Sequence, residues 1–294
     1  MNALGTIFVI VNSLALLALP RRWAALPLLV GACYMTLGQG VEIGPFSFTI
    51  IRILALVGFV RVLVRGERPA GGLNGMDRLM LVWSVWALVS SAFHNEPQNV
   101  LVNRLGLVYN TLGIYFLLRC FCQGMDDVVQ LVKLTAVVLV PVALEMVNEQ
   151  ITGRNLFSIF GGVSEEVAVR NDRLRSQGSF AHAILAGTVG AVCVPLMAGL
   201  WRKGAWLPKA GMLACLAMVF TSASSGPLGS LLLGSLALLL WRWRHWTRQM
   251  RIAAVIGYVL LDLVMKAPAY YLIARIDLAG GSTGWHRAAL IESS

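Results

Sequence analysis

The residues best suited to chemistry in this chain are arginines in a polar stretch between two apolar runs. Residues 148–181 contain Arg154, Arg170, Arg173 and Arg175, and His182 follows where the next apolar run begins. A guanidinium group is always charged and presents a planar fork of donors, which makes arginine a natural partner for phosphate and diphosphate oxygens. Two or three of these arginines, together with the histidine, would be able to clamp a lipid diphosphate and the sugar that it carries.

Structural roles for the same side chains remain open. The arginines can instead pair with the carboxylates of Glu165, Glu166 and Asp172, or contact the phosphates of membrane lipids. Histidine titrates near neutrality and can act as a base or a ligand. At the start of a helix, however, a histidine such as His182 more often caps the helix or hydrogen-bonds to the backbone. Residue spacing alone does not favour anion binding over these roles.

A second polar segment near the end of the sequence offers a different combination of groups. Glycines and hydroxyl side chains at positions 280–283 predict a turn into a helix whose free N–H groups can receive an anion. Trp285 would stack against a sugar face, and the other candidates for diphosphate or glycan binding are Arg275, His286 and Arg287. The alternative is an interfacial helix that anchors Trp285 among lipid headgroups.

Two classes of site are excluded by the pattern. The four histidines, His94, His182, His245 and His286, occur in no HExxH or CxxC arrangement, so we predict no metal site. The net charge of +10 would suit nucleic acid. Its positive charges lie beside apolar runs, however, and form no basic stripe interleaved with exposed aromatic residues, so we expect no nucleic-acid partner.

The elements that must position these residues are membrane helices. The chain is 57% hydrophobic and only 13% charged, with a mean hydropathy of +0.73. Runs of about 14 to 20 apolar residues match a hydrocarbon layer of about 30 Å, and they lack the apolar–polar alternation of barrel strands. No internal repeat divides the chain. We therefore predict an all-α fold, a polytopic integral membrane protein with about ten transmembrane helices in one domain over residues 1–294.

Charge distribution predicts how this domain is oriented. The expected spans are 3–19, 24–38, 45–64, 79–93, 101–118, 128–147, 183–200, 205–222, 228–241 and 252–265. Basic residues follow the odd-numbered spans, as Arg21, Arg119 and Arg242 illustrate, which places those loops in the cytoplasm. The N-terminus, the long loop 148–181 and the C-terminal segment 267–294 then lie on the outer face. Small residues at 221–230 favour an outer turn over a close helix contact.

Taken together, these residues resemble the O-antigen ligase and O-antigen polymerase family of bacterial envelope glycosyltransferases. The likeness depends on residues 153–157, on residues 173–182 leading into the small residues Ala186 and Gly187, on the turn at 221–226, and on residues 280–290. In motif it covers the later half of the chain, and in topology the whole of it. These motifs are less specific than a Walker loop or a zinc ribbon.

The resemblance implies metal-independent, inverting glycosyl transfer without a cofactor on the periplasmic face of the bacterial inner membrane. The donor would be a glycan on undecaprenyl diphosphate, and the acceptor a second lipid-linked glycan or a lipid A core, among membrane lipids. Arginines would neutralise the diphosphate leaving group in place of a metal ion. Arg175 looks like the family's loop arginine that contacts the diphosphate. Polymerase and ligase activities are equally compatible with it.

The sequence departs from the family in two places. Many members carry an arginine where this chain has Ser282, so Arg275 or Arg287 would have to substitute for it. The family's outer-face histidine, proposed as the catalytic base, lies downstream of the tryptophan helix. We therefore expect the base beyond Ser294, outside this chain, which would make the chain an inactive fragment of the enzyme.

A transporter or flippase without catalysis is the rival interpretation. In that case the outer arginines would only recognise an anionic substrate. Transporters usually show repeated halves and broken or charged helices at mid-membrane. This sequence shows neither, which favours the enzyme.

Overall fold

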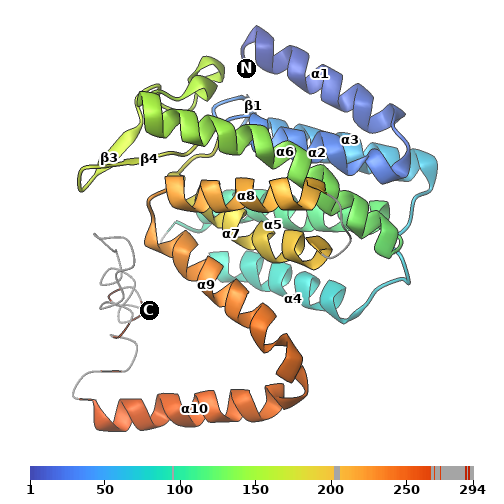
Figure 1. Ribbon diagram of the computed structural model, residues 1–294. Helices are drawn as coiled ribbons and strands as arrows, with labels where there is room; N and C mark the ends of the chain where they lie inside the picture. The colour runs from blue at the N-terminus through green and yellow to red at the C-terminus, as the bar shows by residue number, and fades with distance from the viewer. Residues whose placement is uncertain are drawn as a thin grey trace.

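The computed structural model describes residues 1–94, 96–201 and 206–265, together with positions 268, 272, 289 and 291. It is a bundle of helices with two short hairpins (Figure 1). The α-helices are α1 Ala3–Ala18, α2 Ala25–Tyr34, α3 Ile50–Arg65, α4 Gly75–Val89, α5 Pro97–Phe121, α6 Met125–Thr152, α7 Ala183–Leu200, α8 Trp206–Thr221, α9 Ser225–Leu240 and α10 Thr247–Val264. The strands are β1 Gly40–Ile43, β2 Phe46–Thr49, β3 Ala168–Arg170 and β4 Arg173–Arg175, and short 3₁₀ turns include η1 Arg21–Trp23, η2 Ser90–Phe93, η3 Leu156–Phe160 and η5 Trp241–Trp246.

Each expected span overlaps one of these helices, but not all of the helices have the length of a full crossing. About 20 residues are needed to cross a hydrocarbon layer at 1.5 Å per residue. Within the described residues, five helical segments are long and apolar enough: Gly75–Phe93, Pro97–Phe121, Met125–Thr152, Ala183–Leu200 and Ser225–Val264. The apolar helices α1 and α8 have 16 residues each. The structure thus supports a helical membrane protein, and the count of ten spans stays a prediction.

Two predicted boundaries are wrong for local reasons. The third span was expected from residue 45, yet Phe46–Thr49 is strand β2, paired with β1 through a two-residue turn in which Gly44 has φ +59°. A glycine at positive φ followed by Pro45 favours a hairpin over a helix start. The turn expected over 221–230 is also much shorter. Only residues 222–224 interrupt the helices, with Ala223 at φ +44°, and α9 begins at Ser225.

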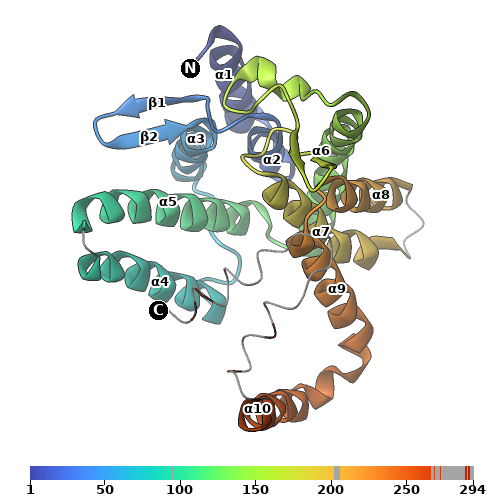
Figure 2. The ribbon, with the colours of Figure 1, turned by 90° about the vertical axis from the view of Figure 1, so that its left-hand side faces the viewer.

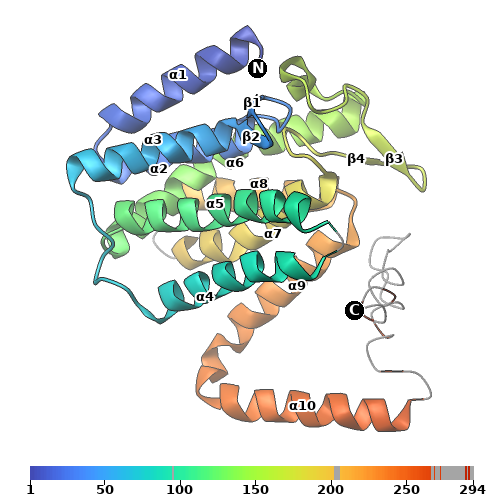
Figure 3. The same cartoon turned by 180° about the vertical axis from the view of Figure 1, so that it is seen from behind.

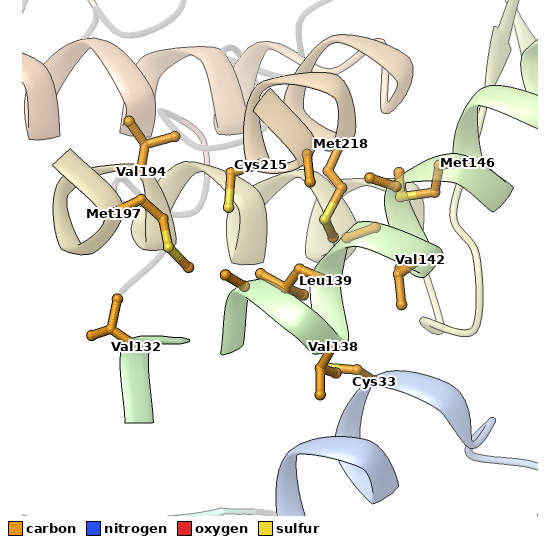
Figure 4. Close-up of a cluster of buried hydrophobic side chains, with 14 of the residues drawn as sticks. Cys33, Val132, Val138, Leu139, Val142, Met146, Val194, Met197, Cys215 and Met218 are labelled. Atoms are coloured by element: carbon orange, nitrogen blue, oxygen red, sulfur yellow. The ribbon is translucent and has the colours of Figure 1, made fainter. Parts of the chain in front are cut away.

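The main core lies between α6, α7 and α8, with α2 on one side (Figure 4). Leu139, Met146, Met197 and Met218 are fully buried there. Glycines let the helices approach closely. A methyl group on Gly190 would lie 2.6 Å from the backbone oxygen of Cys215, so a larger residue would push α7 away from α8.

A second core joins α1, α2, α3 and α5. Figure 3 shows α4 and α5 running side by side on the face opposite to the one seen in Figure 1. In contrast, α9 packs mainly on α7 and then leaves the bundle, and no residue of α10 is buried. The bundle therefore has a packed body, α1 to α8, from which the last two described helices extend.

Several basic residues that served as topology signals are also structural. Arg61 is 1% exposed, donates to the carbonyl oxygens of Leu16 and Leu19 at the end of α1, and pairs with Glu67 at 2.9 Å. These carbonyls have no partner inside their own helix, so a buried arginine is a suitable cap. In the same way Arg119 pairs with Asp77, and both Arg21 and Arg22 pair with Asp127.

Candidate functional site

The polar stretch between α6 and α7 is held by two buried side chains, one within the stretch itself and one on the last turn of α6. Asn155 is 2% exposed and donates through Nδ2 to the carbonyl oxygen of Gly178 at 2.8 Å. Glu149 is 0% exposed, and its two carboxylate oxygens accept the backbone N–H groups of Gln177 and Gly178 at 2.8 and 2.7 Å. Gly178 has φ +58°, a conformation that suits glycine. These contacts hold in place the segment that follows Arg175.

Gln150 joins strand β4 to the end of α8. Its side-chain nitrogen lies 2.9 Å from the carbonyl oxygen of Leu174, 3.0 Å from the hydroxyl of Ser176 and 2.8 Å from the carbonyl oxygen of Thr221. The backbone N–H of Ser176 donates to the same carbonyl oxygen of Thr221 at 3.0 Å. Because an amide has only two N–H hydrogens, the three acceptors share them. One side chain thus places β4 against the turn between α8 and α9.

This placement brings Arg175 to the turn between α8 and α9. Its Nη2 donates to the hydroxyl of Ser224 at 2.6 Å, and that hydroxyl donates in turn to the carbonyl oxygen of Ser222. The Nε of Arg175 is buried and has no hydrogen-bond partner among the described residues. Burial lowers the pKa of Arg175, and the positive charge of Arg170 lowers it further. The Arg175 guanidinium nevertheless remains charged. A bound anion would offset both the burial and the repulsion from Arg170, and would accept the free Nε–H.

A polar pocket of about 460 Å³ opens at the same end of the bundle, and its lining includes Leu174 and Ala223, the chain neighbours of Arg175 and Ser224. It lies at the end of the bundle that faces the viewer in Figure 2, where α6 and α8 end and the β3–β4 hairpin and α9 begin. Its walls come from four elements that are distant in sequence: Gln150, Asp172, Arg173, Leu174, Phe220, Ala223 and Leu228. Arg173 enters it from a tight hairpin turn in which Asn171 and Asp172 both have positive φ, as a type I′ turn requires.

The first turn of α9 adds to the positive potential of the pocket. Ser224 is the N-cap residue of this helix, but its hydroxyl caps no N–H group of the helix. A helix leaves its first N–H groups without partners inside the helix and has the positive end of its dipole there. Ala223 and Leu228, which flank this terminus, both line the pocket. The pocket thus combines the guanidinium of Arg173 with a helix N-terminus, against the single carboxylate of Asp172. Arg175, two residues further along β4, adds a second positive charge at the same end of the bundle, and the arrangement is suited to an anion.

Comparison with protein-family models, with curated proteins and with solved structures returns no match. The resemblance to O-antigen ligases and polymerases therefore stays a prediction. In the portion of the chain that the structure describes, no group of three or more His, Cys, Asp or Glu side chains is placed to hold a metal ion.

Of the sequence candidates that the structure describes, Arg173 lines the pocket, whereas Arg154, Arg175 and His182 do not. Arg154 is exposed and forms an isolated backbone bridge with Glu166. His182 is exposed at the N-cap of α7, where its carbonyl oxygen accepts the N–H groups of Leu185 and Ala186 while its side chain caps nothing. Its role in the fold is therefore a backbone one. The remaining four candidates, Arg275, Trp285, His286 and Arg287, lie outside the described residues.

Ion pairing within the loop was the alternative role for the arginines. Within the described ranges, no ion pair of 4.0 Å or less joins Arg154, Arg170 or Arg175 to a carboxylate. Paired arginines occur instead on helices α3 and α5 and on η1, as described above. For these three loop arginines the structure shows no competing carboxylate partner.

The sequence pointed to charged residues in the loop but not to the polar residues that hold the surrounding elements together. Glu149, Gln150 and Asn155 were not singled out. For Glu149 and Gln150 the signal was a polar run at the end of a long apolar helix, residues 148–150, immediately before the loop. Polar groups at the end of a span normally face water. The burial of Glu149 and Asn155 and the tertiary hydrogen bonds of Gln150 distinguish these residues.

Proposed function

We propose that this chain is a membrane glycosyltransferase of the O-antigen ligase or polymerase type. It would take a glycan from undecaprenyl diphosphate at the periplasmic face of the bacterial inner membrane and pass it to a lipid-linked glycan or lipid A core. The observation that carries the proposal is the guanidinium of Arg175, which is half-buried at the turn between α8 and α9 and has one N–H without a partner among the described residues. Arg173, two residues earlier on the same strand, lines the polar pocket. A diphosphate is an anion whose oxygens can accept hydrogen bonds from guanidinium groups at this site.

In this reaction the acceptor hydroxyl oxygen attacks the anomeric carbon of the donor sugar, and the bond from that carbon to the phosphate oxygen breaks. The electron pair of the broken bond stays on the diphosphate, and a general base takes the hydroxyl proton. Arg173, Arg175 and the N-terminus of α9 would stabilise the charge that grows on the leaving group. Donors that are already in place cost little reorganisation at that moment, so they lower the barrier more than mobile ones.

A pair of substitutions in the same hairpin tests this proposal. In the complete protein, Arg175→Ala should abolish glycan transfer, and Arg175→Lys should leave only a small part of it because an ammonium group cannot replace a planar fork. Arg170→Ala removes the same charge from an exposed position on β3 and is the matched control. Transfer is measured with membranes that contain equal amounts of each variant. Normal transfer by Arg175→Ala would contradict the proposal.

The reaction products distinguish the enzyme from a transporter. A transporter that recognises the same anion would also lose binding in Arg175→Ala, but the wild type would move the intact lipid across the bilayer and form no new glycosidic bond. The products of the wild type, reconstituted with donor and acceptor on the same side of the membrane, therefore decide the class. Detection of a glycan that is lengthened, or newly bonded to the acceptor, supports the enzyme.

A further inference from the structure

An apolar groove runs along the lipid-facing side of α6 and α8, which lie side by side in the bundle (Figure 1). It has a volume of about 280 Å³. Its floor is made of alanines, of which Ala143 and Ala214 are buried, whereas Leu144 and Leu213 are 66% exposed and form its rims. Small residues below and large residues on both sides make a channel along the helices.

The groove leads to the polar pocket. On α6 the last groove residue is Val147, and Gln150 in the pocket wall lies one turn further on. On α8 the last groove residue is Ala217, and Phe220 in the pocket wall again follows by one turn. Residues three apart lie on the same face of a helix. The two hollows are therefore successive parts of one path, apolar for about 10 Å along the helices and polar at its end.

We propose that this groove holds the first isoprene units, next to the diphosphate, of the lipid whose headgroup occupies the pocket. This inference rests on the proposed function and adds to it the route by which the lipid reaches the site, directly from the bilayer between α6 and α8. The chain and the headgroup of such a lipid are joined covalently, so a site for one must continue into a site for the other. The continuity of groove and pocket meets that requirement.

The shape of the groove favours a hydrocarbon chain over a protein helix. An α-helix with its side chains is about 10 Å across. It would rest on the rims at Leu144 and Leu213 and leave the alanine floor without contacts. A single extended chain reaches the floor and gains dispersion contacts along its length. In a bilayer such contacts, rather than the hydrophobic effect, select one partner over another because the surrounding lipid is equally apolar.

Filling the groove tests the proposal in the full chain. Ala217→Leu and Ala210→Leu each place a larger side chain in the groove, the second about 15 Å along the helix from Phe220. Ala237→Leu, at an exposed position on α9, is the matched control. The probes are undecaprenyl diphosphate and inorganic diphosphate, which carries the headgroup charge without the chain. Affinities are measured with each variant in nanodiscs.

We expect both groove variants to bind undecaprenyl diphosphate about tenfold more weakly, the effect of losing about ten close carbon–carbon contacts. Inorganic diphosphate binding should not change, which shows that the pocket is intact, and Ala237→Leu should match the wild type for both probes. Unchanged affinity for undecaprenyl diphosphate in both groove variants would overturn the inference. If Arg175→Ala still abolished binding in that case, the proposed function would survive it.

Other occupants give different results. An equal loss of affinity for both probes would overturn the inference, because the substitutions would then act on the pocket and not on the groove. Displacement of undecaprenyl diphosphate from the wild type by an equal concentration of dioleoylphosphatidylglycerol would show a general lipid site. Conversion of an oligomeric wild type into monomers by both groove variants, seen by light scattering, would assign the groove to a second copy of the chain. Failure of the wild type to bind either probe would count against the proposed function itself.

Discussion

The carboxylate of Glu149 accepts the backbone N–H of Gly178 at 2.7 Å, in a place where neither residue is exposed to solvent. The residues are 29 positions apart. One oxygen of the carboxylate thus fixes the end of the arginine-bearing loop, and the other accepts the N–H of Gln177. The carboxylate supports the site without lining the pocket, so its loss should act first on stability.

We expect Glu149→Ala to destabilise the protein by about 2 to 4 kcal/mol, because two N–H groups lose their acceptors and at least one of them is buried. Glu149→Gln keeps one acceptor oxygen and should cost about half as much. The free energy of unfolding in mixed detergent micelles measures both. The control is Glu165→Ala, since that residue is exposed. Equal stability of Glu149→Ala and the wild type would show that the loop is held by other contacts.

At Gln150, a change of charge should weaken diphosphate binding more than a change of size. Its amide nitrogen faces two carbonyl oxygens and a hydroxyl, and the residue lines the pocket. Gln150→Glu replaces the donor by a carboxylate that repels both carbonyls and any bound anion. We expect it to abolish binding of inorganic diphosphate, whereas Gln150→Leu should weaken binding only through misplacement of β4. If the two variants bind diphosphate equally, the pocket is not an anion site.

Two arginines on α3 should differ sharply in their effect on stability. Arg61 is 0% exposed in its side chain and binds Glu67 and two carbonyl oxygens of α1. Arg61→Ala leaves Glu67 unpaired and nearly buried, and should cost about 3 kcal/mol or more. Arg65 is exposed and makes its contacts at the surface. Arg65→Ala should cost about 1 kcal/mol or less. Thermal unfolding in detergent compares them, and similar losses would contradict the assignment of Arg61 as a buried cap.

Labelling of introduced cysteines tests the orientation on which the proposed function depends. Ser164→Cys, in the loop between α6 and α7, should react with a membrane-impermeant thiol reagent added to spheroplasts. Arg68→Cys, after α3, should react only once the membrane is opened. Both positions are exposed, so reagent access differs by side of the membrane alone. The wild type gives the background from the five native cysteines. The opposite pattern would place the arginines in the cytoplasm and rule out the proposed transfer reaction.

Helix positions could be predicted closely from the sequence, because apolar run length and flanking polar residues are local properties. The expected span 183–200 coincides with α7, and 3–19 differs from α1 by one residue. The first turn of the third span was missed because a Gly44–Pro45 turn outweighs the apolar character of Phe46–Thr49. Whether each helix crosses a bilayer is a question about the environment, which neither hydropathy nor packing within the chain answers.

In the candidate site, too, some features follow from the sequence and others from tertiary packing. The type and number of charged groups in the loop are sequence properties, and they alone pointed to an anion partner. Which arginine reaches the turn between α8 and α9 was decided by tertiary contacts. Arg175 meets Ser224, 49 positions away, only because α8 returns beside α6 and Gln150 bridges them. Residue spacing along a chain does not determine distances between segments that meet through packing, so the exposed positions of Arg154 and His182 could be found only in the folded structure.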